Sequence, residues 1–140
     1  MGLGERAFAL NLILEMIFVA KRRCISVDVY ENNDFIELSD SAKVLYTAFI
    51  LRTDDDGFVI NHRTVMRLMG ATEEKLQELL DTGFVIDVGR VLVIKHWFIH
   101  NRIQPSRKVD TIYQDELSRL FVNEWNEYEL YPQFVNKMLT

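Results

Sequence analysis

The chain has 140 residues, of which 49% are hydrophobic and 26% charged, and its formal net charge is −5. This composition is ordinary for a globular protein, and the length suits one domain with an appendage. Because the chain as a whole is acidic, it is not a polycation, and any binding to nucleic acid must come from a local basic patch. The single cysteine, Cys24, excludes an internal disulfide and fits a reducing cytosol.

An apolar segment stands close to the N-terminus. Residues 7–20 are apolar except for Asn11 and Glu15. A membrane span needs about 20 apolar residues, so this segment is too short. The basic residues 21–23 follow the apolar run, whereas a signal peptide carries its positive charge before it. We therefore interpret residues 1–19 as a leader, either an amphipathic helix or non-native sequence, and expect a cytoplasmic protein without a membrane partner.

The first predicted elements lie between residues 24 and 52. Residues 24–30 alternate apolar and polar side chains, which predicts a half-buried strand or an extended arm. A polar break that can hold one helical turn follows over residues 31–38. Ser39 is a good helix N-cap, because its hydroxyl can accept a backbone N–H, and apolar residues then recur at helical spacing until about Arg52.

A turn, a short strand, two helices and a hairpin come next. The turn is predicted at residues 53–57, the strand at 58–60, the helices at 61–69 and 72–82, and the hairpin at 84–94 with its tip at Gly89 and Arg90. Helix, strand, helix, turn, helix and hairpin is the layout of a winged helix-turn-helix.

The sequence therefore predicts an α+β fold that is mainly α. We expect residues 20–108 to form a winged-helix DNA-binding domain. Residues 109–140 are acidic and aromatic, and we expect them to form a helical tail with a helix at 115–125.

The candidate DNA contacts are basic side chains near the wing and on the neighbouring helices. Residues 95–108 contain no acidic side chain, which is unusual in an acidic protein. The second helix of the helix-turn-helix begins with Glu73 and Glu74, which phosphates would repel, so packing against the core is favoured there over reading of the major groove. The candidates are Lys21, Arg22, Arg23, Arg63, Arg67, Lys75, Arg90, Lys95, His96, Arg102, Arg107 and Lys108.

Other chemistry finds less support. The three aspartates before Gly57 suggest calcium, but EF-hand spacing would place the first ligand at Arg52, so we predict a capped turn. His96 and His100 are four residues apart without a carboxylate or thiol close in sequence, so we expect no metal site. Because no nucleophile–base pair and no phosphate loop is present, we expect no enzyme and no cofactor.

Several runs of the sequence, in order, resemble one known family. They are residues 20–23, 40–46, 53–59, 69–71, 83–86, 93–97 and 113–114. These runs are similar to the N-terminal domain of phage replisome organizers, DnaD-like replication initiation proteins of phages and prophages of low-GC Gram-positive bacteria. The resemblance implies a winged helix that binds origin DNA, self-associates and helps to recruit the host helicase machinery. It also suggests that the native protein begins at Val19.

The functional expectation is a non-enzymatic replication protein in the cytoplasm of a bacterial host, which holds DNA through phosphate contacts. Its expected partners are DNA, a second copy in a dimer, and a replicative helicase or helicase loader. Two alternatives stay open. One is a winged-helix module for dimerisation or other protein contacts, in which the acidic aromatic tail docks a partner. The other is a transcriptional regulator.

Overall fold

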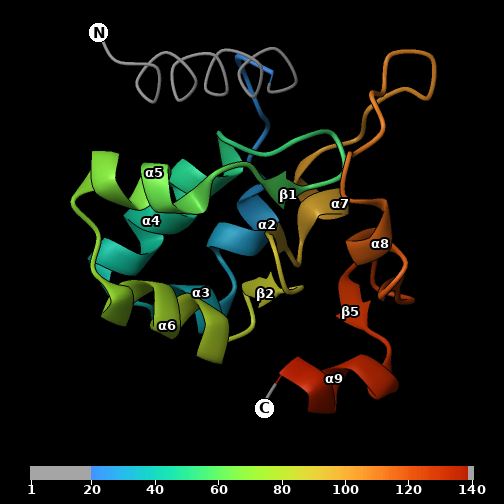
Figure 1. The fold of residues 1–140 in the computed structure, drawn as a ribbon. Coiled ribbons are helices and arrows are strands. Elements are labelled where there is room, and N and C mark those ends of the chain that lie inside the picture. Colours follow the sequence, from blue (N-terminus) through green and yellow to red (C-terminus); the bar gives the residue numbers. More distant parts are fainter. Residues whose placement is uncertain (1–19, 139–140) are drawn as a thin grey trace, which may run out of the picture.

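The computed structural model describes residues 20–138, so the leader predicted at residues 1–19 lies outside the described residues. The structure is a mixed α/β fold with small antiparallel sheets (Figure 1). Its elements are α2 (Val27–Tyr30), α3 (Asn33–Ile36), α4 (Asp40–Ile50), β1 (Phe58–Val59), α5 (His62–Met69), α6 (Glu73–Asp81), β2 (Val85–Asp87), β3 (Leu92–Ile94), α7 (Trp97–His100), α8 (Gln114–Leu117), β4 (Leu120–Val122), β5 (Tyr128–Leu130) and α9 (Pro132–Met138). None of the helices within residues 20–138 is long and apolar enough to cross a bilayer.

Helix α4 begins at Ser39, as predicted. The Ser39 hydroxyl accepts the N–H of Ala42 at 3.2 Å, which caps the helix. Ser39 also donates its N–H and its hydroxyl to the Glu78 carboxylate on α6, both at 2.8 Å. One side chain therefore starts α4 and ties it to α6, and the two helices pack together on the left-hand side of Figure 1.

The three-stranded sheet has the order β1–β3–β2, and both pairings are antiparallel. Phe58 of β1 lies opposite Val93 of β3, and Val85 of β2 lies opposite Ile94. The predicted hairpin is confirmed by the pairing of β2 with β3. The side chains of this sheet and of α4 form one core with residues of α3, α7 and β5. Its largest members are Trp97, Tyr46, Tyr128, Phe35, Phe49 and Phe58.

Gly57 is required at the turn before β1. Its φ of +90° is one that side-chain-bearing residues rarely adopt, and a Cβ there would lie 2.5 Å from Cγ of Trp97. The Trp97 indole N–H donates to the Asp55 carbonyl at 3.1 Å. The backbone of this turn therefore packs directly against the Trp97 ring of α7.

The strand predicted at residues 24–30 is wrong. The side chain of Ser26 accepts the N–H of Asp28 and starts the single helical turn α2. Only Val29 of the alternating apolar residues is buried, whereas Ile25 is 37% and Val27 63% exposed. Alternation over so few residues did not reflect a sheet face, because a local cap competes with extended structure. The extended part is limited to the residues before Ser26.

The helix predicted at residues 115–125 is also wrong. Helix α8 ends at Leu117, and β4 and β5 then pair as a hairpin. At its tip, the Asn123 side chain accepts the N–H groups of Trp125 and Glu127, and Asn126 takes a left-handed φ of 60°. Residues 109–138 therefore contain two strands as well as short helices, and Tyr128 reaches the core instead of lying in a separate tail.

The three aspartates form the predicted capped turn. Asp54 accepts the N–H groups of Asp56 and Phe58 through one carboxylate oxygen, each at 3.0 Å. The other Asp54 oxygen accepts the Thr111 hydroxyl at 2.6 Å, and Asp56 accepts the Thr111 N–H at 2.8 Å. Asp55 accepts the Val109 N–H at 2.9 Å. The turn thus holds the segment that leads from α7 to α8.

Candidate nucleic-acid interface

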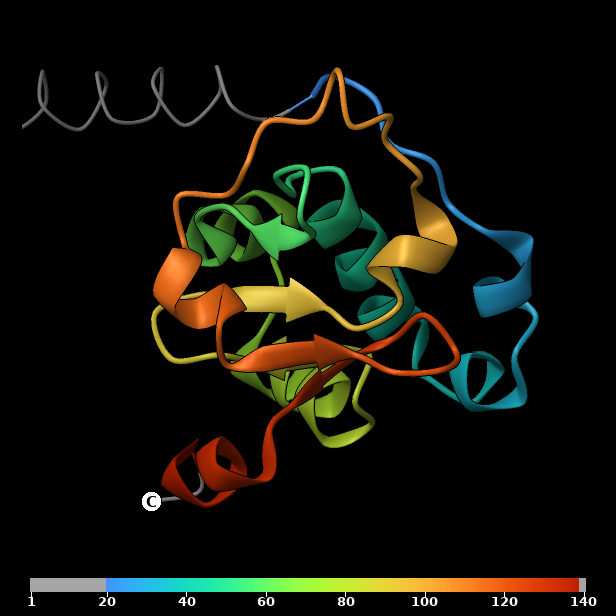
Figure 2. The same ribbon diagram turned by 90° about the vertical axis from the view of Figure 1, so that its right-hand side faces the viewer.

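Two irregular segments, residues 20–26 and 101–108, carry exposed cations at one edge of the molecule. The Cys24 N–H donates to Oδ1 of Asn101 at 2.9 Å, and Nδ2 of Asn101 donates to the Cys24 carbonyl at 3.1 Å. Figure 2 shows both segments at the top of the molecule, residues 20–26 in blue and 101–108 in orange. The paired hydrogen bonds therefore join two parts of the chain that are far apart in sequence.

Five exposed cations on or beside these segments make no ion pair within the described residues. We name this set the cationic edge: Lys21, Arg22, Arg52, Arg102 and Arg107. Arg52 was not among the predicted candidates. It lies at the end of α4 beside Thr53, whose carbonyl accepts a hydrogen bond from Arg23 at 2.8 Å. No local sequence signal places Arg52 near the N-terminal segment, because the Arg23–Thr53 contact depends on the tertiary fold.

Arg23 does not belong to this surface. Its guanidinium lies 2.9 Å from the Asp55 carboxylate and over the Trp97 ring at 5.2 Å, and its side chain is only 4% exposed. An arginine held in this way is not available to phosphates. The sequence placed it with Lys21 and Arg22 because the three are consecutive, but only its neighbours point to solvent.

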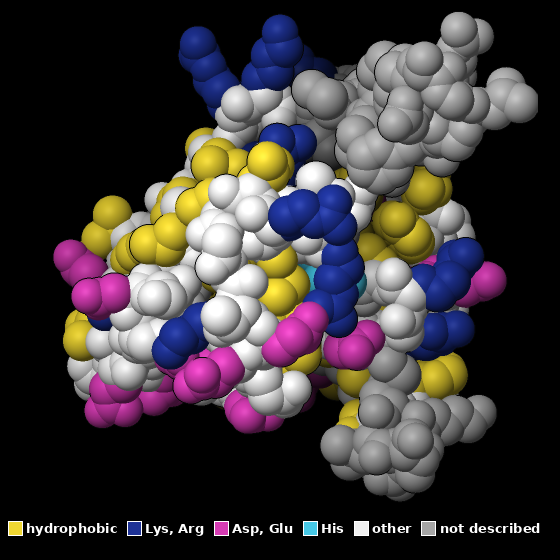
Figure 3. Space-filling view, turned by 60° about the vertical axis from the view of Figure 1, so that its left-hand side comes forward, with side chains coloured by type: hydrophobic (Ala, Val, Ile, Leu, Met, Phe, Trp, Pro, Cys, Tyr) yellow, Lys and Arg dark blue, Asp and Glu magenta, His cyan; other side chains and the backbone are white. Residues whose placement is uncertain are grey.

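Four other side chains predicted to contact DNA lie against carboxylates. Ion pairs join Arg63 to Glu73, Lys75 to Glu78, and Lys108 to both Asp56 and Asp110, and Nε2 of His96 lies 3.0 Å from Glu127. The two ion pairs of Lys108 measure 2.9 Å each. Figure 3 shows Asp and Glu side chains gathered along the lower edge, at the height of α6. These cations therefore add little net positive charge to their surroundings.

Arg67 and Lys95 lie apart from the cationic edge. Arg67 is exposed on α5 and makes no ion pair in the part of the chain that the structure describes. Lys95 is half-buried at the end of β3 and lines a pocket. The structure thus does not bring all the predicted cations onto one face.

Arg90 lies at the tip of the hairpin, as predicted, but it binds a buried carboxylate. Its Nε donates to Glu116 at 2.5 Å and its Nη2 donates to the second Glu116 oxygen at 3.1 Å. The Glu116 side chain is 1% exposed, and these hydrogen bonds hold the pKa of Glu116 below its usual range. Arg90 therefore anchors α8 to the hairpin, and its charge is offset before any phosphate approaches.

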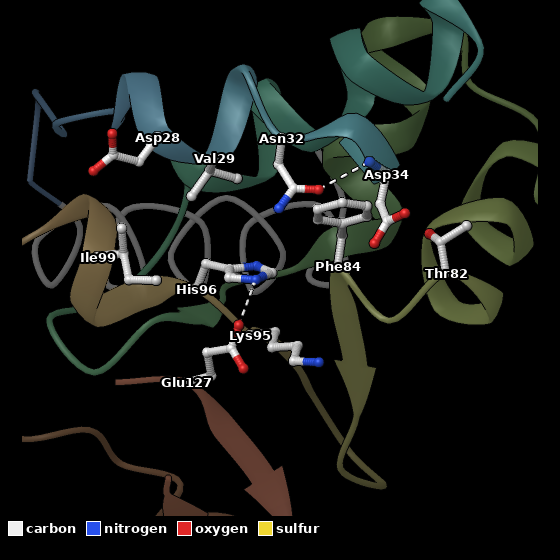
Figure 4. A pocket seen from close by; sticks show the side chains of 10 residues that line it. All are labelled: Asp28, Val29, Asn32, Asp34, Thr82, Phe84, Lys95, His96, Ile99 and Glu127. Atoms are coloured by element: carbon white, nitrogen blue, oxygen red, sulfur yellow. Dashed lines mark hydrogen bonds and ion pairs between the residues drawn. The ribbon is translucent and has the colours of Figure 1, made fainter. Parts of the chain in front are cut away.

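His96 lies in a pocket of about 220 Å³ between α2, α3 and the β4–β5 hairpin (Figure 4). Its Nε2 is 3.0 Å from Glu127, its ring packs against Phe84 at 5.5 Å, and its buried Nδ1 has no hydrogen-bond partner among residues 20–138. Burial lowers the pKa of His96 although Glu127 opposes the shift. Asp28 and Asp34 also line the pocket. A neutral histidine among carboxylates is unsuited to phosphate.

His100 is an interior residue. Its Nδ1 accepts the Ser26 N–H at 2.9 Å, and its Nε2 is hydrogen-bonded to the Tyr46 hydroxyl at 2.8 Å. Burial lowers the pKa of His100 to about 4. The ring is therefore neutral at pH 7 with its proton on Nε2, because Nδ1 accepts. Residues 20–138 contain no cluster of three side chains that could hold a metal ion.

A second pocket lies beside the cationic edge, between residues 101–108 and the tip of the β4–β5 hairpin. It measures about 270 Å³, and its lining includes the aromatic rings of Trp97 and Phe98 and the cations Arg102 and Lys108. Asn126 closes it from the hairpin side. The adjacent Trp125 is 67% exposed. In the sequence, Trp125 is only one of several aromatic residues among acidic ones, and no pattern distinguishes it.

Comparison with known proteins gives no relative: no family model, no curated protein and no solved structure matches the chain.

Proposed function

We propose that the protein is a non-enzymatic DNA-binding protein of the winged-helix class that acts in phage or prophage DNA replication. Two observations support the class. The elements from α4 to β3 follow the order helix, strand, helix, helix, strand, strand. The three strands pair in the order β1–β3–β2, with the hairpin formed by β2 and β3. The role in replication follows from the sequence resemblance to replisome organizers.

The cationic edge is the observation that carries the proposal. Its members are exposed and make no ion pair within the described residues, whereas most other predicted contacts are matched by carboxylates. Cations that contact phosphates release counterions from nucleic acid and bind with little regard to base sequence. DNA on this edge would therefore be held by its backbone.

Helix α6 is not the main contact in this proposal. In helix-turn-helix proteins the second helix lies in the major groove with its first turn on the bases. The first turn of α6 instead carries Glu73 and Glu74, both exposed, and Lys75 is paired with Glu78. Phosphates next to this turn would be repelled. The proposal thus assigns binding to the opposite, upper edge of the molecule in Figure 1.

The test is fluorescence anisotropy of a labelled duplex across a salt series. If the five cations of the edge contact phosphates, log K should fall with log salt with a slope of about −4.5. The double variant Arg102→Ala/Arg107→Ala should reduce this slope by about 2 and weaken binding to every sequence tested. Arg67→Ala removes an exposed cation elsewhere and should leave both values unchanged. Absence of binding at low salt would refute the proposal.

A second candidate function, self-association, is favoured by a groove between α4 and the turn that joins α5 to α6. The groove measures about 290 Å³ and is lined by Val44 and Met69. These side chains are 51% and 46% exposed, and the neighbouring Leu68 is 67% exposed. Light scattering over a concentration range tests whether two copies associate here. Val44→Asp should then shift the protein to the monomer, whereas Ile112→Asp, an exposed position elsewhere, should not.

A further inference from the structure

The exposed indole of Trp125 lies on a turn whose backbone is fixed. Asn123 Oδ1 accepts the Trp125 N–H at 2.9 Å and the Glu127 N–H at 3.0 Å. Asn126 completes the turn in the left-handed region. The position of Trp125 is therefore set before any partner arrives, so binding there loses little backbone freedom. A single exposed apolar residue needs no explanation by itself, but the residue that follows Trp125, Asn126, lines a pocket.

The pocket that Asn126, the neighbour of Trp125, lines from the hairpin also contains cations. Arg102 and Lys108 line it from the loop, and Trp97 and Phe98 line it from α7. Trp97 is only 1% exposed, so Trp125 is the tryptophan whose ring is open to a base. Aromatic side chains beside a basic groove are the combination that binds single-stranded nucleic acid, because bases stack on the rings while cations contact the phosphates. The pocket is also continuous with the cationic edge, since Arg102 belongs to both.

Among the described residues that line the pocket, Arg102 is the cation that no carboxylate matches. Asp55 lines the pocket, but its carboxylate is matched by Arg23 at 2.9 Å and accepts the Val109 N–H. Lys108 is engaged by Asp56 and Asp110. Arg102 is exposed and makes no ion pair within residues 20–138, so it supplies the unmatched positive charge. Glu124, exposed on the hairpin tip, is the opposing charge closest in sequence to Trp125.

A single strand and a duplex would use this surface differently. Bases in a duplex are stacked and paired, so an indole on a hairpin tip cannot reach their faces. Bases in a single strand are open to stacking, which contributes to affinity beyond the phosphate contacts. We propose that the protein prefers single-stranded nucleic acid, with Trp125 as a stacking platform and Arg102 as its adjacent phosphate contact. This inference rests on the proposed function and names its substrate class.

The experiment measures the anisotropy of labelled oligothymidine of about 16 nucleotides, the upper end of the site size of one single-strand-binding domain. A duplex of the same length is titrated in parallel. Trp125→Ala should weaken single-strand binding about tenfold and leave duplex binding unchanged. Trp125→Phe should restore most of the loss, because its ring still stacks. Ile112→Ala, which removes another exposed apolar side chain (72% exposed), is the matched control.

Two further readouts separate stacking from charge. Trp97 is 1% exposed, so quenching of tryptophan fluorescence by oligothymidine should come from Trp125 and should disappear in Trp125→Phe. Glu124→Gln should strengthen binding to both nucleic acids, since it removes a negative charge without removing a ring.

The outcomes distinguish this inference from the proposed function. If Trp125→Ala leaves single-strand binding unchanged while Arg102→Ala/Arg107→Ala still weakens binding, the stacking role is refuted and DNA binding stands. Equal losses for both nucleic acids would also refute it. If neither nucleic acid binds at low salt, both proposals fail.

Discussion

The Asn101 side chain binds both backbone polar groups of Cys24, accepting its N–H at 2.9 Å and donating to its carbonyl at 3.1 Å. Asn101 is 7% exposed and Cys24 is exposed, so both hydrogen bonds are partly buried. We expect Asn101→Ala to lower the free energy of unfolding by about 2 kcal/mol, because two hydrogen bonds of about 1 kcal/mol each are lost. Urea denaturation of the full chain measures this effect.

The same substitution should weaken DNA binding several-fold, because Lys21 and Arg22 are no longer held beside the 101–108 loop. Lys21→Ala serves as the comparison, since it removes one charge without disturbing the Asn101 contact. If Asn101→Ala lowers stability but leaves affinity unchanged, the N-terminal segment takes no part in binding.

A methyl group at Gly57 should be costly. Gly57→Ala places a Cβ 2.5 Å from Cγ of Trp97 at a φ of +90°, so it combines overlap with backbone strain. We expect a loss of about 3 kcal/mol in the free energy of unfolding. Gly83 has a similar φ of +82° with open space around it, so Gly83→Ala should cost only the strain, about 1 kcal/mol. Thermal unfolding of both variants separates the cost of overlap with Trp97 from the cost of backbone strain. Equal losses of stability in the two variants would contradict the role of Trp97.

Removal of Arg90 should destabilise the fold more than removal of any member of the cationic edge. Arg90→Ala leaves the Glu116 carboxylate, 1% exposed, without its two donors. Adding Glu116→Gln to Arg90→Ala should recover part of the lost stability, because the buried charge is gone. Melting temperatures of Arg90→Ala, the double variant and Arg102→Ala provide the check. A melting temperature of Arg90→Ala equal to that of Arg102→Ala would contradict the anchoring role.

Stability should depend on pH through His100. Its pKa is about 4 in the folded protein against an ordinary value of 6.5, so between these values the unfolded chain binds more protons. The free energy of unfolding therefore rises from pH 4 to 6.5 and levels above that range. The contribution lost on acidification is about 3 kcal/mol.

The matched variant for this measurement is His100→Gln, which cannot titrate. Asp54, whose pKa burial raises, contributes the opposite slope in acid, and His96 contributes the same sign as His100. The difference between wild type and His100→Gln across pH isolates His100. Parallel pH curves would show that its burial does not shift its titration.

The predictable parts of the fold were those with local signals. Ser39 marked the start of α4, and Gly70 marked the end of α5, where the structure has a left-handed residue. The predictions for residues 24–30 and 115–125 were wrong because each run was too short to distinguish the apolar repeat of a strand, every 2 residues, from that of a helix, every 3.6 residues. A hairpin signal was present in the second run, since Asn123 and Asn126 are the residues of its turn.

The candidate site was less predictable than the fold. Lys21, Arg22 and Arg23 look alike in sequence, yet Arg23 is buried against Asp55 and the other two are exposed. Which cation is matched by a carboxylate depends on contacts between distant segments, such as Arg90 with Glu116. The clustering of cations on one edge follows from the Cys24–Asn101 contact, which no local pattern indicates.

The turn that contains the three aspartates, residues 53–57, determines how the molecule unfolds. Detaching residues 109–111 would leave Asp54 and Asp56, which are 5% and 4% exposed, facing each other without the Thr111 donors. Opening of this irregular segment is therefore coupled to unfolding of the β1 turn. In hydrogen exchange, the amide of Thr111, which is 5% exposed and donates to Asp56, should be protected as long as those of β3, although Thr111 belongs to no helix or strand. A truncated chain that ends at Lys108 should therefore no longer unfold in one cooperative transition.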